Sequence, residues 1–256
     1  MYANYHTHTY LCRHASGTPR EYVENAIYSG IKVLGFSDHV PYPFSKNGYE
    51  SLFRMHLNDI DTYYTEISQL RDEYKDKIKI YIGYEAEYYP DEFLKMLEHI
   101  NKYECDYLIL GQHCLNNEYD GKPANQPTQD NELLISYVDQ VITAIGTGKF
   151  TYIAHPDIIN YRGCEKIYQQ EMARLCTAAK KLNIPLEINL LGLSENRHYP
   201  YDVFWKLVRD VGNDIILGFD AHSPIANGNI EIETAGLKYA SKFGLKPLKT
   251  VELRKV

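Results

Sequence analysis

The stretch Tyr5-His6-Thr7-His8-Thr9 spans the end of the first predicted strand, residues 2–8, and His14 follows six residues after His8. Side chains on a strand alternate between its two faces, so His6 and His8 point to the same side. Two imidazoles held in this way form a two-pronged clamp for a metal ion. The pair alone is weak evidence, because ten histidines in 256 residues produce such pairs by chance. The rest of the chain must show whether further ligands reach the same place.

Apolar strand patterns alternate with amphipathic helix patterns along the whole chain. The first helix begins at Thr18-Pro19-Arg20-Glu21, a capping box with proline at the first helical position, and ends at Gly30. Seven such units follow one another, and after the first their predicted strands are residues 32–37, 78–83, 107–110, 150–154, 185–189 and 214–219. Continuous apolar strands separated by helices predict a parallel sheet, and seven units in this length favour a closed α/β barrel. We expect residues 1–256 to form this one domain.

The composition narrows the class of protein. The hydrophobic fraction of 44% and charged fraction of 24% are ordinary for a soluble globular protein. A net charge of −7 argues against binding a nucleic acid polymer, but not against a phosphorylated substrate, because bound metal ions would reverse the local sign. Five cysteines without a Cys-x-x-Cys pair favour a reduced, cytoplasmic protein. The first strand pattern begins at the N-terminus and no apolar run approaches the roughly 18 residues of a membrane span, so we expect neither a signal peptide nor a membrane partner.

Residue types that bind metals stand at the end of strand after strand. They are His6, His8 and His14 after the first strand, His39, Glu85, His113 and His155 after the next four, and Asp220 and His222 after the seventh. A single histidine in a loop is usually solvated, but the carboxyl ends of parallel barrel strands meet at one mouth, where active sites lie. Nine ligands exceed the three or four that one catalytic zinc takes. We therefore expect two or three ions, with a carboxylate bridging at least two of them.

The ligand types indicate the metals and the reaction. Imidazole and carboxylate suit Zn, Fe, Mn, Co or Ni and are wrong for Ca. A site with several such ions activates water as hydroxide and clamps both oxygens of an in-line displacement, so hydrolysis of a phosphate ester is the natural reaction. No Gly-x-Gly-x-x-Gly or P-loop pattern follows a strand, and the common nucleotide folds lose support.

Other polar residues near the same strand ends are candidates to bind or orient. Arg162 and Arg197 follow the fifth and sixth strands, and arginine matches phosphate with two hydrogen bonds, although simple surface exposure is about as good an explanation for each. Tyr119, in the long loop 114–129, is a candidate to line the pocket. Asp38 is a candidate to orient His39, although an Asp beside a His is as often an ordinary turn residue. For Glu87, capping of the next helix is a sufficient explanation without any role at the site.

At this point the motifs resemble those of a known family, the polymerase and histidinol phosphatase (PHP) superfamily, over essentially the whole chain. The matching stretches are His6-x-His8, Ser37-Asp38-His39, Gly83-Tyr84-Glu85, Gly111-Gln112-His113, His155-Pro156 and Asp220-Ala221-His222. Within the superfamily, Glu187-Ile188-Asn189 and Asp220-Ala221-His222-Ser223-Pro224 are similar to the histidinol-phosphatase branch.

The resemblance implies a distorted TIM-like (β/α)7 barrel with a centre of three divalent ions, Zn, Mn or Fe. By motif, the first ion would be held by His6, His8, Glu85 and Asp220, the second by Glu85, His113 and His155, and the third by His14, His39 and His222. Glu85, Asp220 and His222 are also the residues that we expect to be catalytic. The implied reaction is hydrolysis of L-histidinol phosphate to L-histidinol and phosphate by a metal-activated hydroxide.

Three alternatives remain open. The same metals could serve a phosphoesterase that acts on nucleotides or on phosphotyrosine. A metallo-amidohydrolase also has His-x-His after its first strand, but usually offers a lysine after the fourth, where this chain has Gly111-Gln112-His113. A metal-dependent binding module without turnover is the third, and the complete ligand set argues against it.

Overall fold

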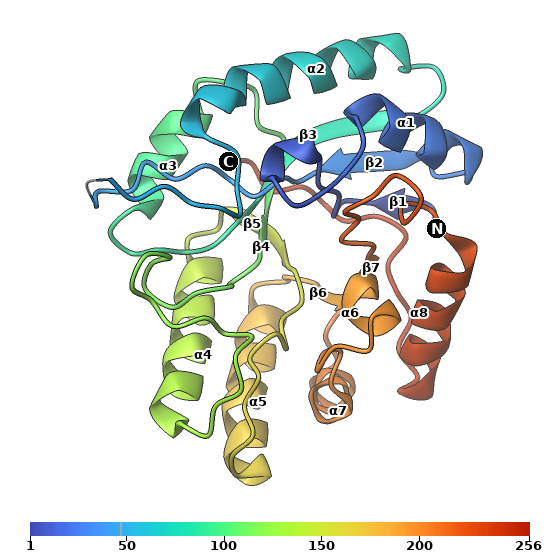
Figure 1. The fold of residues 1–256 in the computed structure, drawn as a ribbon. Coiled ribbons are helices and arrows are strands. Elements are labelled where there is room, and N and C mark those ends of the chain that lie inside the picture. The colour runs from blue at the N-terminus through green and yellow to red at the C-terminus, as the bar shows by residue number, and fades with distance from the viewer. Residues whose placement is uncertain (47) are drawn as a thin grey trace.

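Seven parallel strands follow one another around the molecule in chain order. The protein is described here by a computed structural model that covers residues 1–46 and 48–256 (Figure 1). The strands are β1 (Ala3–Asn4), β2 (Val33–Phe36), β3 (Lys79–Ala86), β4 (Tyr107–Leu110), β5 (Phe150–Ile153), β6 (Leu186–Asn189) and β7 (Ile215–Gly218). A parallel bridge between Thr7 and Ala221 joins the chain after β1 to the chain after β7. The predicted barrel of seven parallel strands is confirmed, and it closes at the carboxyl ends of its strands.

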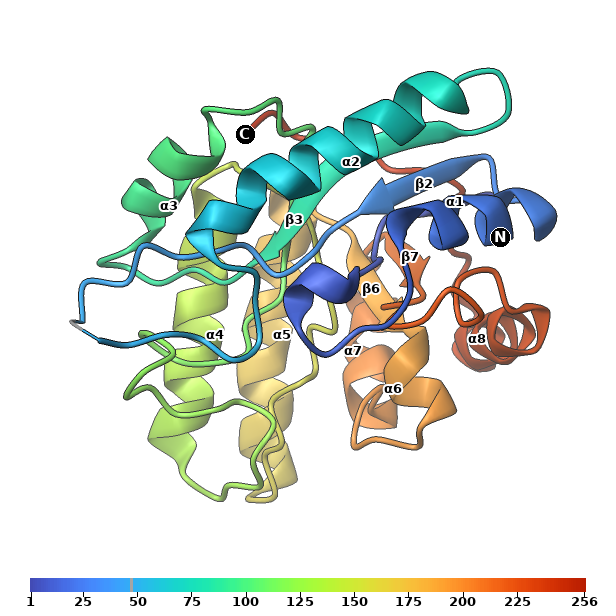
Figure 2. The ribbon, with the colours of Figure 1, turned by 45° about the horizontal axis from the view of Figure 1, so that its top comes forward.

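Helices cover the outside of this barrel. They are α1 (Pro19–Tyr28), α2 (Ile60–Glu73), α3 (Phe93–Ile100), α4 (Asn131–Gly146), α5 (Glu165–Lys181), α6 (Leu190–Ser194), α7 (Asp202–Val211) and α8 (Ile230–Lys242), with short 3-10 turns η1 (Tyr10–Cys12) and η2 (Leu57–Asp59). Figures 1 and 2 show α1 and α2 beside β2 and β3, and α4, α5 and α7 packed in a row elsewhere on the barrel. Within the described residues, no helix is long and apolar enough to cross a membrane.

Local signals set most of the element boundaries. Thr18 and Glu21 form the predicted capping box, which starts α1. Three predictions need correction. The first strand, predicted over residues 2–8, ends at Asn4, so His6 and His8 lie in the chain after β1, where Thr7 makes a bridge with Ala221. β3 continues to Ala86, so Glu85 lies inside the strand and not after it. Residues 190–199, predicted as a loop, contain α6, because the side chain of Asn189 accepts a hydrogen bond from the Gly192 backbone and caps a short helix.

Large side chains fill the barrel below its mouth. This inner apolar cluster consists of Ala3, Tyr5, Val33, Tyr107, Ile109, Tyr152, Ala154 and Ile216, and Val251 and Leu253 of the C-terminal tail pack against it. The Tyr107 hydroxyl donates to the carbonyls of Tyr5 (2.7 Å) and Phe36 (3.0 Å), which satisfies a polar group that would otherwise be costly to bury. The filled interior gives the polar mouth above it a rigid floor.

The close fit of Tyr107 against β3 gives a test of the fold. A Cβ at Gly83 would lie 2.4 Å from Tyr107 Cε1 and 2.6 Å from the Tyr107 carbonyl oxygen, so Gly83→Ala should lower the free energy of unfolding by about 1–3 kcal/mol. Gly146 is the matched control, since a Cβ there meets nothing within 4 Å and alanine favours a helix. Urea denaturation measures both variants. Equal stability of the two would contradict the described packing.

Candidate metal centre

The carboxylate of Glu85 stands at the centre of the barrel mouth, surrounded by imidazole rings. It is 1% exposed, and β3 holds it beside Gly111, where a Cβ would lie 1.9 Å from Oε1. Its two oxygens lie near five ring nitrogens: Oε2 is 3.5 Å from His6 Nε2, 3.5 Å from His8 Nε2 and 3.1 Å from His39 Nδ1, and Oε1 is 3.5 Å from His113 Nε2 and 2.8 Å from His155 Nε2. One carboxylate therefore reaches ligands from four other strand ends.

Asp220 completes the group from the opposite side. Its Oδ1 lies 3.1 Å from His8 Nε2 and 3.4 Å from both His6 Nε2 and His222 Nδ1. Next to it, His222 Nε2 and His14 Nε2 are only 3.0 Å apart. The nine predicted ligands are thus brought together at one mouth.

The ligand atoms form several overlapping groups. Two groups combine residues of different predicted shells, namely His6, His155 and Asp220, and His39, Glu87 and His113. Two others fall within one predicted shell each. The side chains of His6, His8 and Glu85 offer ligand atoms that lie within 4.8 Å of one another, and so do those of His14, His39 and His222. For the middle shell, Glu85 contacts both His113 and His155 as described above.

Two of these residues have a strained backbone. His155 has φ 30° and Asp220 has φ 49°, in the left-handed region that residues with a side chain rarely occupy. Strain of this kind persists where the surrounding structure over-determines it, and it clusters at functional sites. The backbone at the ends of β5 and β7 is bent to aim these two side chains into the mouth.

The imidazoles of His6 and His8 have ring nitrogens that are free to bind a cation. The Nε2 atoms of His6 and His8 are buried and have no hydrogen-bond partner in the part of the chain that the structure describes. Glu187 Oε2 lies 2.9 Å from His6 Nδ1, and a carboxylate there fixes the proton on Nδ1 and leaves Nε2 free to ligate. Buried polar atoms normally have a partner, so these nitrogens fit a metal ion.

The electrostatics of the mouth favour ionised carboxylates but divide the imidazoles. Burial would lower the pKa of His6, but Glu187, Asp220 and Glu85 raise it well above its ordinary value. Burial would also lower the pKa of His113, but Glu85 and Glu87 raise it. Burial alone would raise the pKa of Glu85, but His113, His39 and His6 hold that pKa well below its ordinary value. Burial and the neighbouring His8 lower the pKa of His222 to about 3. Metal binding requires ionised carboxylates and neutral imidazoles, so an ion bound among these histidines would displace the protons of those whose pKa is raised.

Comparison with known proteins identifies the family. The family model described as PHP domain matches residues 4–190. The chain belongs to the PHP domain family.

Individual relatives resemble this PHP domain along most of their length. A probable histidinol-phosphatase of Deinococcus radiodurans is 27% identical over 230 residues, which cover 86% of this chain and 85% of the relative. A histidinol phosphate phosphatase structure from Lactococcus lactis, complexed with zinc, L-histidinol and phosphate, has a TM-score of 0.73 at 22% identity and covers 98% of both chains. Metal-dependent tyrosine phosphatases of Bacillus subtilis and Streptococcus pneumoniae give a TM-score of 0.51 at 14% identity. The likeness to these structures establishes the fold.

Two carboxylates of this PHP domain have partners that the sequence did not predict. Asp38 accepts hydrogen bonds from the backbone (2.7 Å) and hydroxyl of Thr9 and lies 3.6 Å from His8 Nδ1, so the expectation that it orients His39 is wrong. Glu87 does not cap a helix, because α3 begins at Phe93 with Glu92 before it, and the Oε1 of Glu87 lies 3.0 Å from His113 Nδ1. Both residues follow a strand end, and sequence position alone does not tell which neighbouring ring they face.

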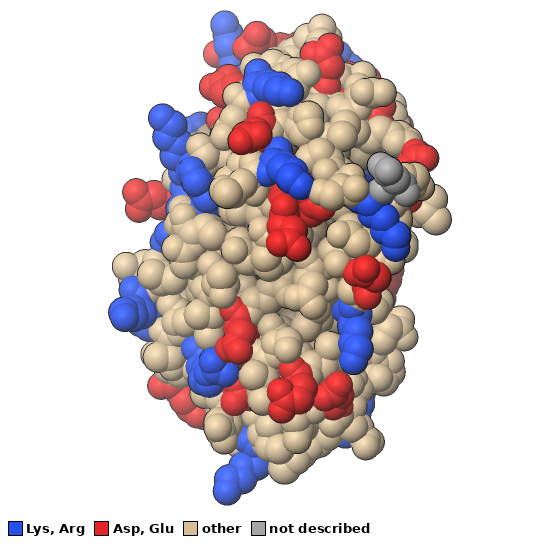
Figure 3. Space-filling view, turned by 90° about the vertical axis from the view of Figure 1, so that its left-hand side faces the viewer, with Lys and Arg blue, Asp and Glu red and all other residues tan. Residues whose placement is uncertain are grey.

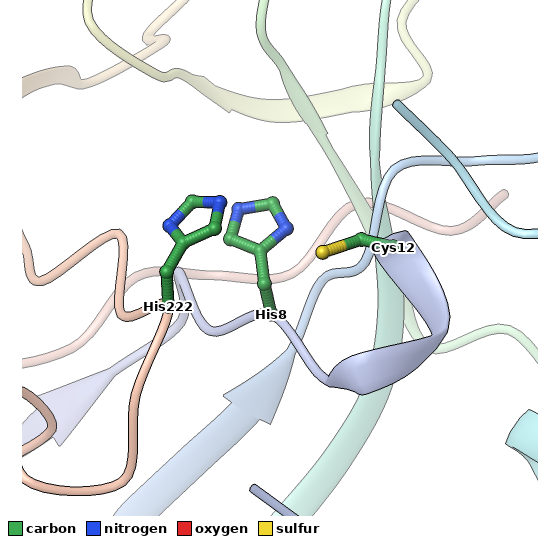
Figure 4. Close-up of side chains that lie close together, drawn as sticks. All are labelled: His8, Cys12 and His222. Atoms are coloured by element: carbon green, nitrogen blue, oxygen red, sulfur yellow. The ribbon is translucent and has the colours of Figure 1, made fainter. Parts of the chain in front are cut away.

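Cys12 is a further group at the edge of the mouth. Figure 4 shows His8 lying between Cys12 and His222, and the ring centroids of the two histidines are 4.2 Å apart. The thiol and one nitrogen from each ring lie within 4.8 Å of one another, so these three side chains form a second possible grouping beside the predicted third shell. Burial would raise the pKa of the Cys12 thiol, but hydrogen bonds with His14 and His8 hold that pKa below its ordinary value.

A cavity of about 530 Å³ opens above the ligands. Arg197 lines it together with seven of the nine predicted ligands: His14, His39, Glu85, His113, His155, Asp220 and His222. Arg162 instead lines a neighbouring cavity of about 240 Å³, and its Nε donates to Asn160 Oδ1 at 2.7 Å. Tyr119 packs edge to face against Phe44 and Tyr49. Of the three predicted substrate contacts, Arg197 is therefore the one that faces the larger cavity.

The contact between Glu187 and His6 predicts a loss of metal affinity. In Glu187→Ala, His6 Nδ1 loses its acceptor and the ring loses its orientation, so zinc affinity should fall by about 10–100-fold. Glu171→Gln is the control, since this carboxylate is also buried but pairs with Arg174 on α5. Competition with a chromophoric chelator measures both variants. Equal affinity would show that Glu187 does not orient His6.

Removal of divalent ions should destabilise the fold. The mouth buries Glu85, Asp220 and several imidazoles, and a ligand that binds only the folded state stabilises it by mass action. We expect dialysis against a chelator to lower Tm and added Zn²⁺ or Mn²⁺ to restore it, as measured by calorimetry. An unchanged Tm in the metal-free protein would contradict the site.

Proposed function

We propose that the protein is a metal-dependent phosphatase that hydrolyses L-histidinol phosphate to L-histidinol and phosphate, in the cytoplasm and as a step of histidine biosynthesis. The observation that carries this proposal is the pair of buried carboxylates, Glu85 and Asp220, ringed by imidazoles beneath a cavity that Arg197 also lines. Two of the relatives that match this chain over most of both lengths are named as a probable histidinol-phosphatase and a histidinol phosphate phosphatase, which supports the same substrate.

Nine residues would hold three divalent transition-metal ions, Zn, Mn or Fe. His6, His8, Glu85 and Asp220 would bind the first, Glu85, His113 and His155 the second, and His14, His39 and His222 the third. Asp220 and His222 lie beyond residues 4–190, the part that the family model matches. The proposed centre therefore needs the chain from its first strand to its seventh, as expected for one domain over residues 1–256.

The bound ions would supply a Lewis acid that activates water and neutralises charge on the phosphoryl oxygens. The role of the chain is to orient the reactants. Glu85 and Asp220 carry the negative charge that would hold the ions at the strand ends. The Arg197 side chain is exposed at the cavity. Its Nε (2.8 Å) and Nη2 (2.7 Å) pair with Glu195 Oε2, and its Nη1 donates to the Tyr199 hydroxyl at 2.9 Å, so one N–H on each of Nη1 and Nη2 is left to bind a phosphoryl oxygen. Arg162 and Tyr119 remain predictions as substrate contacts.

The surface charge fits a small substrate better than a polymer. On the face seen in Figure 3, basic and acidic side chains alternate, and among the described residues no continuous basic area spreads over that face. Binding of nucleic acid polymers depends on such an area. A cavity of about 530 Å³ is the size that takes a small molecule.

Steady-state kinetics on four compounds test whether L-histidinol phosphate is the preferred substrate. The panel is L-histidinol phosphate, p-nitrophenyl phosphate, a nucleoside bisphosphate and a phosphotyrosine peptide. We expect kcat/KM to be highest for L-histidinol phosphate. In Glu85→Ala it should fall about 10³-fold, because several kcal/mol of charge stabilisation are lost with the ions. A higher kcat/KM for another phosphomonoester would overturn the assignment of L-histidinol phosphate as the substrate. Full activity of Glu85→Ala would overturn the metal mechanism.

A further inference from the structure

Arg54 lies in the long loop 40–57, lines the larger cavity, and is only 4% exposed. Each of its guanidinium nitrogens donates within the protein. Nε donates to Glu118 Oε2 (2.8 Å), Nη1 to the Val40 carbonyl (2.8 Å) and to Glu87 Oε2 (3.2 Å), and Nη2 to Glu87 Oε1 (3.0 Å) and to Glu118. These contacts use all five N–H donors of an arginine. Arg54 therefore has no donor left for a phosphate, although it borders the cavity.

One side of this arginine reaches the metal ligands through Glu87. Glu87 is 1% exposed and lies 3.0 Å from His113 Nδ1, while His113 Nε2 faces Glu85 at 3.5 Å. A carboxylate on Nδ1 fixes the proton there and turns Nε2 toward the ions. Arg54 donates to both oxygens of Glu87, at 3.2 Å to Oε2 and 3.0 Å to Oε1, and so fixes the position of the carboxylate that faces His113.

The other side of Arg54 ties the two long loops together. Glu118 belongs to loop 114–129, and its Oε1 accepts from the hydroxyl of Tyr49 (2.7 Å), which belongs to loop 40–57. The Arg54 guanidinium also lies over the rings of Tyr42 (5.4 Å) and Phe44 (5.9 Å). Residues of the two loops are therefore joined at a buried ion pair beside the cavity.

We propose that Arg54 is a positioning residue with two separable effects: through Glu87 it orients His113 for the metal, and through Glu118 it fixes the two loops as a rigid rim for the substrate. The rim effect rests on the proposed phosphatase function, whereas the effect on His113 does not. Lysine cannot replace arginine here, because an ammonium group has three donors and cannot bridge both carboxylates and the Val40 carbonyl in a fixed fork.

The test combines zinc affinity of the metal-free protein, by chelator competition, with KM and kcat for L-histidinol phosphate and p-nitrophenyl phosphate. Arg54→Lys should weaken zinc binding at least about tenfold and raise KM at least fivefold. Glu87→Ala should weaken zinc binding with KM within twofold of wild type, and Glu87→Gln should recover part of the affinity, since its amide oxygen still accepts from His113. Glu118→Gln should raise KM and leave zinc affinity within twofold.

Arg20→Lys is the matched control, because Arg20 makes a two-point pair with Glu73 (2.7 Å for each bond) on the outer helices. It should change both quantities by less than twofold. The proposal is overturned if Arg54→Lys, folded by its thermal melt, keeps wild-type zinc affinity and KM. If Arg54→Lys does not fold, the Glu87 and Glu118 variants decide, and equal effects of both on zinc affinity and on KM overturn it. A different preferred substrate would overturn the proposed function and leave the zinc result standing.

Discussion

The mouth of the barrel depends on one buried carboxylate surrounded by imidazoles. Glu85 is 1% exposed and lies within 3.5 Å of ring nitrogens that come from the ends of four other strands. A charge buried in this way is tolerated only where positive charge or ligands compensate it. Three features of the mouth help to compensate the buried charge of Glu85. They are the positions of the histidines, the strained backbone at His155 and Asp220, and the orienting contacts of Glu187 and Glu87.

The fold makes this arrangement possible because parallel strands deliver their carboxyl ends to one place. The inner cluster around Tyr107 fills the barrel to just below the mouth, and the bridge between Thr7 and Ala221 closes the ring at the level of the ligands. The chain thus places an apolar, tightly packed floor under a polar site. Rigid packing below is what keeps the ligand atoms close together without covalent links between the strands.

The barrel and the convergence of the nine candidate ligands at one mouth could be predicted from the sequence, because strand periodicity and residue type are local signals. The residues that orient these ligands were harder to predict. Glu187 lies inside an apolar strand, and Glu87 is as consistent with a helix cap as with a ring partner, so only the packed structure shows which imidazole each contacts. Asp38 was assigned to its chain neighbour His39 but faces His8 and Thr9, since contacts across strands decide its direction.

We propose that Glu85 bridges ions held by these nine residues, and anomalous diffraction from crystals of the protein grown with zinc would locate them. We expect three anomalous peaks at the mouth, with Glu85 between two of them and His14, His39 and His222 around the third. A single peak, or peaks that the Glu85 carboxylate does not contact, would rule out the bridging role of Glu85.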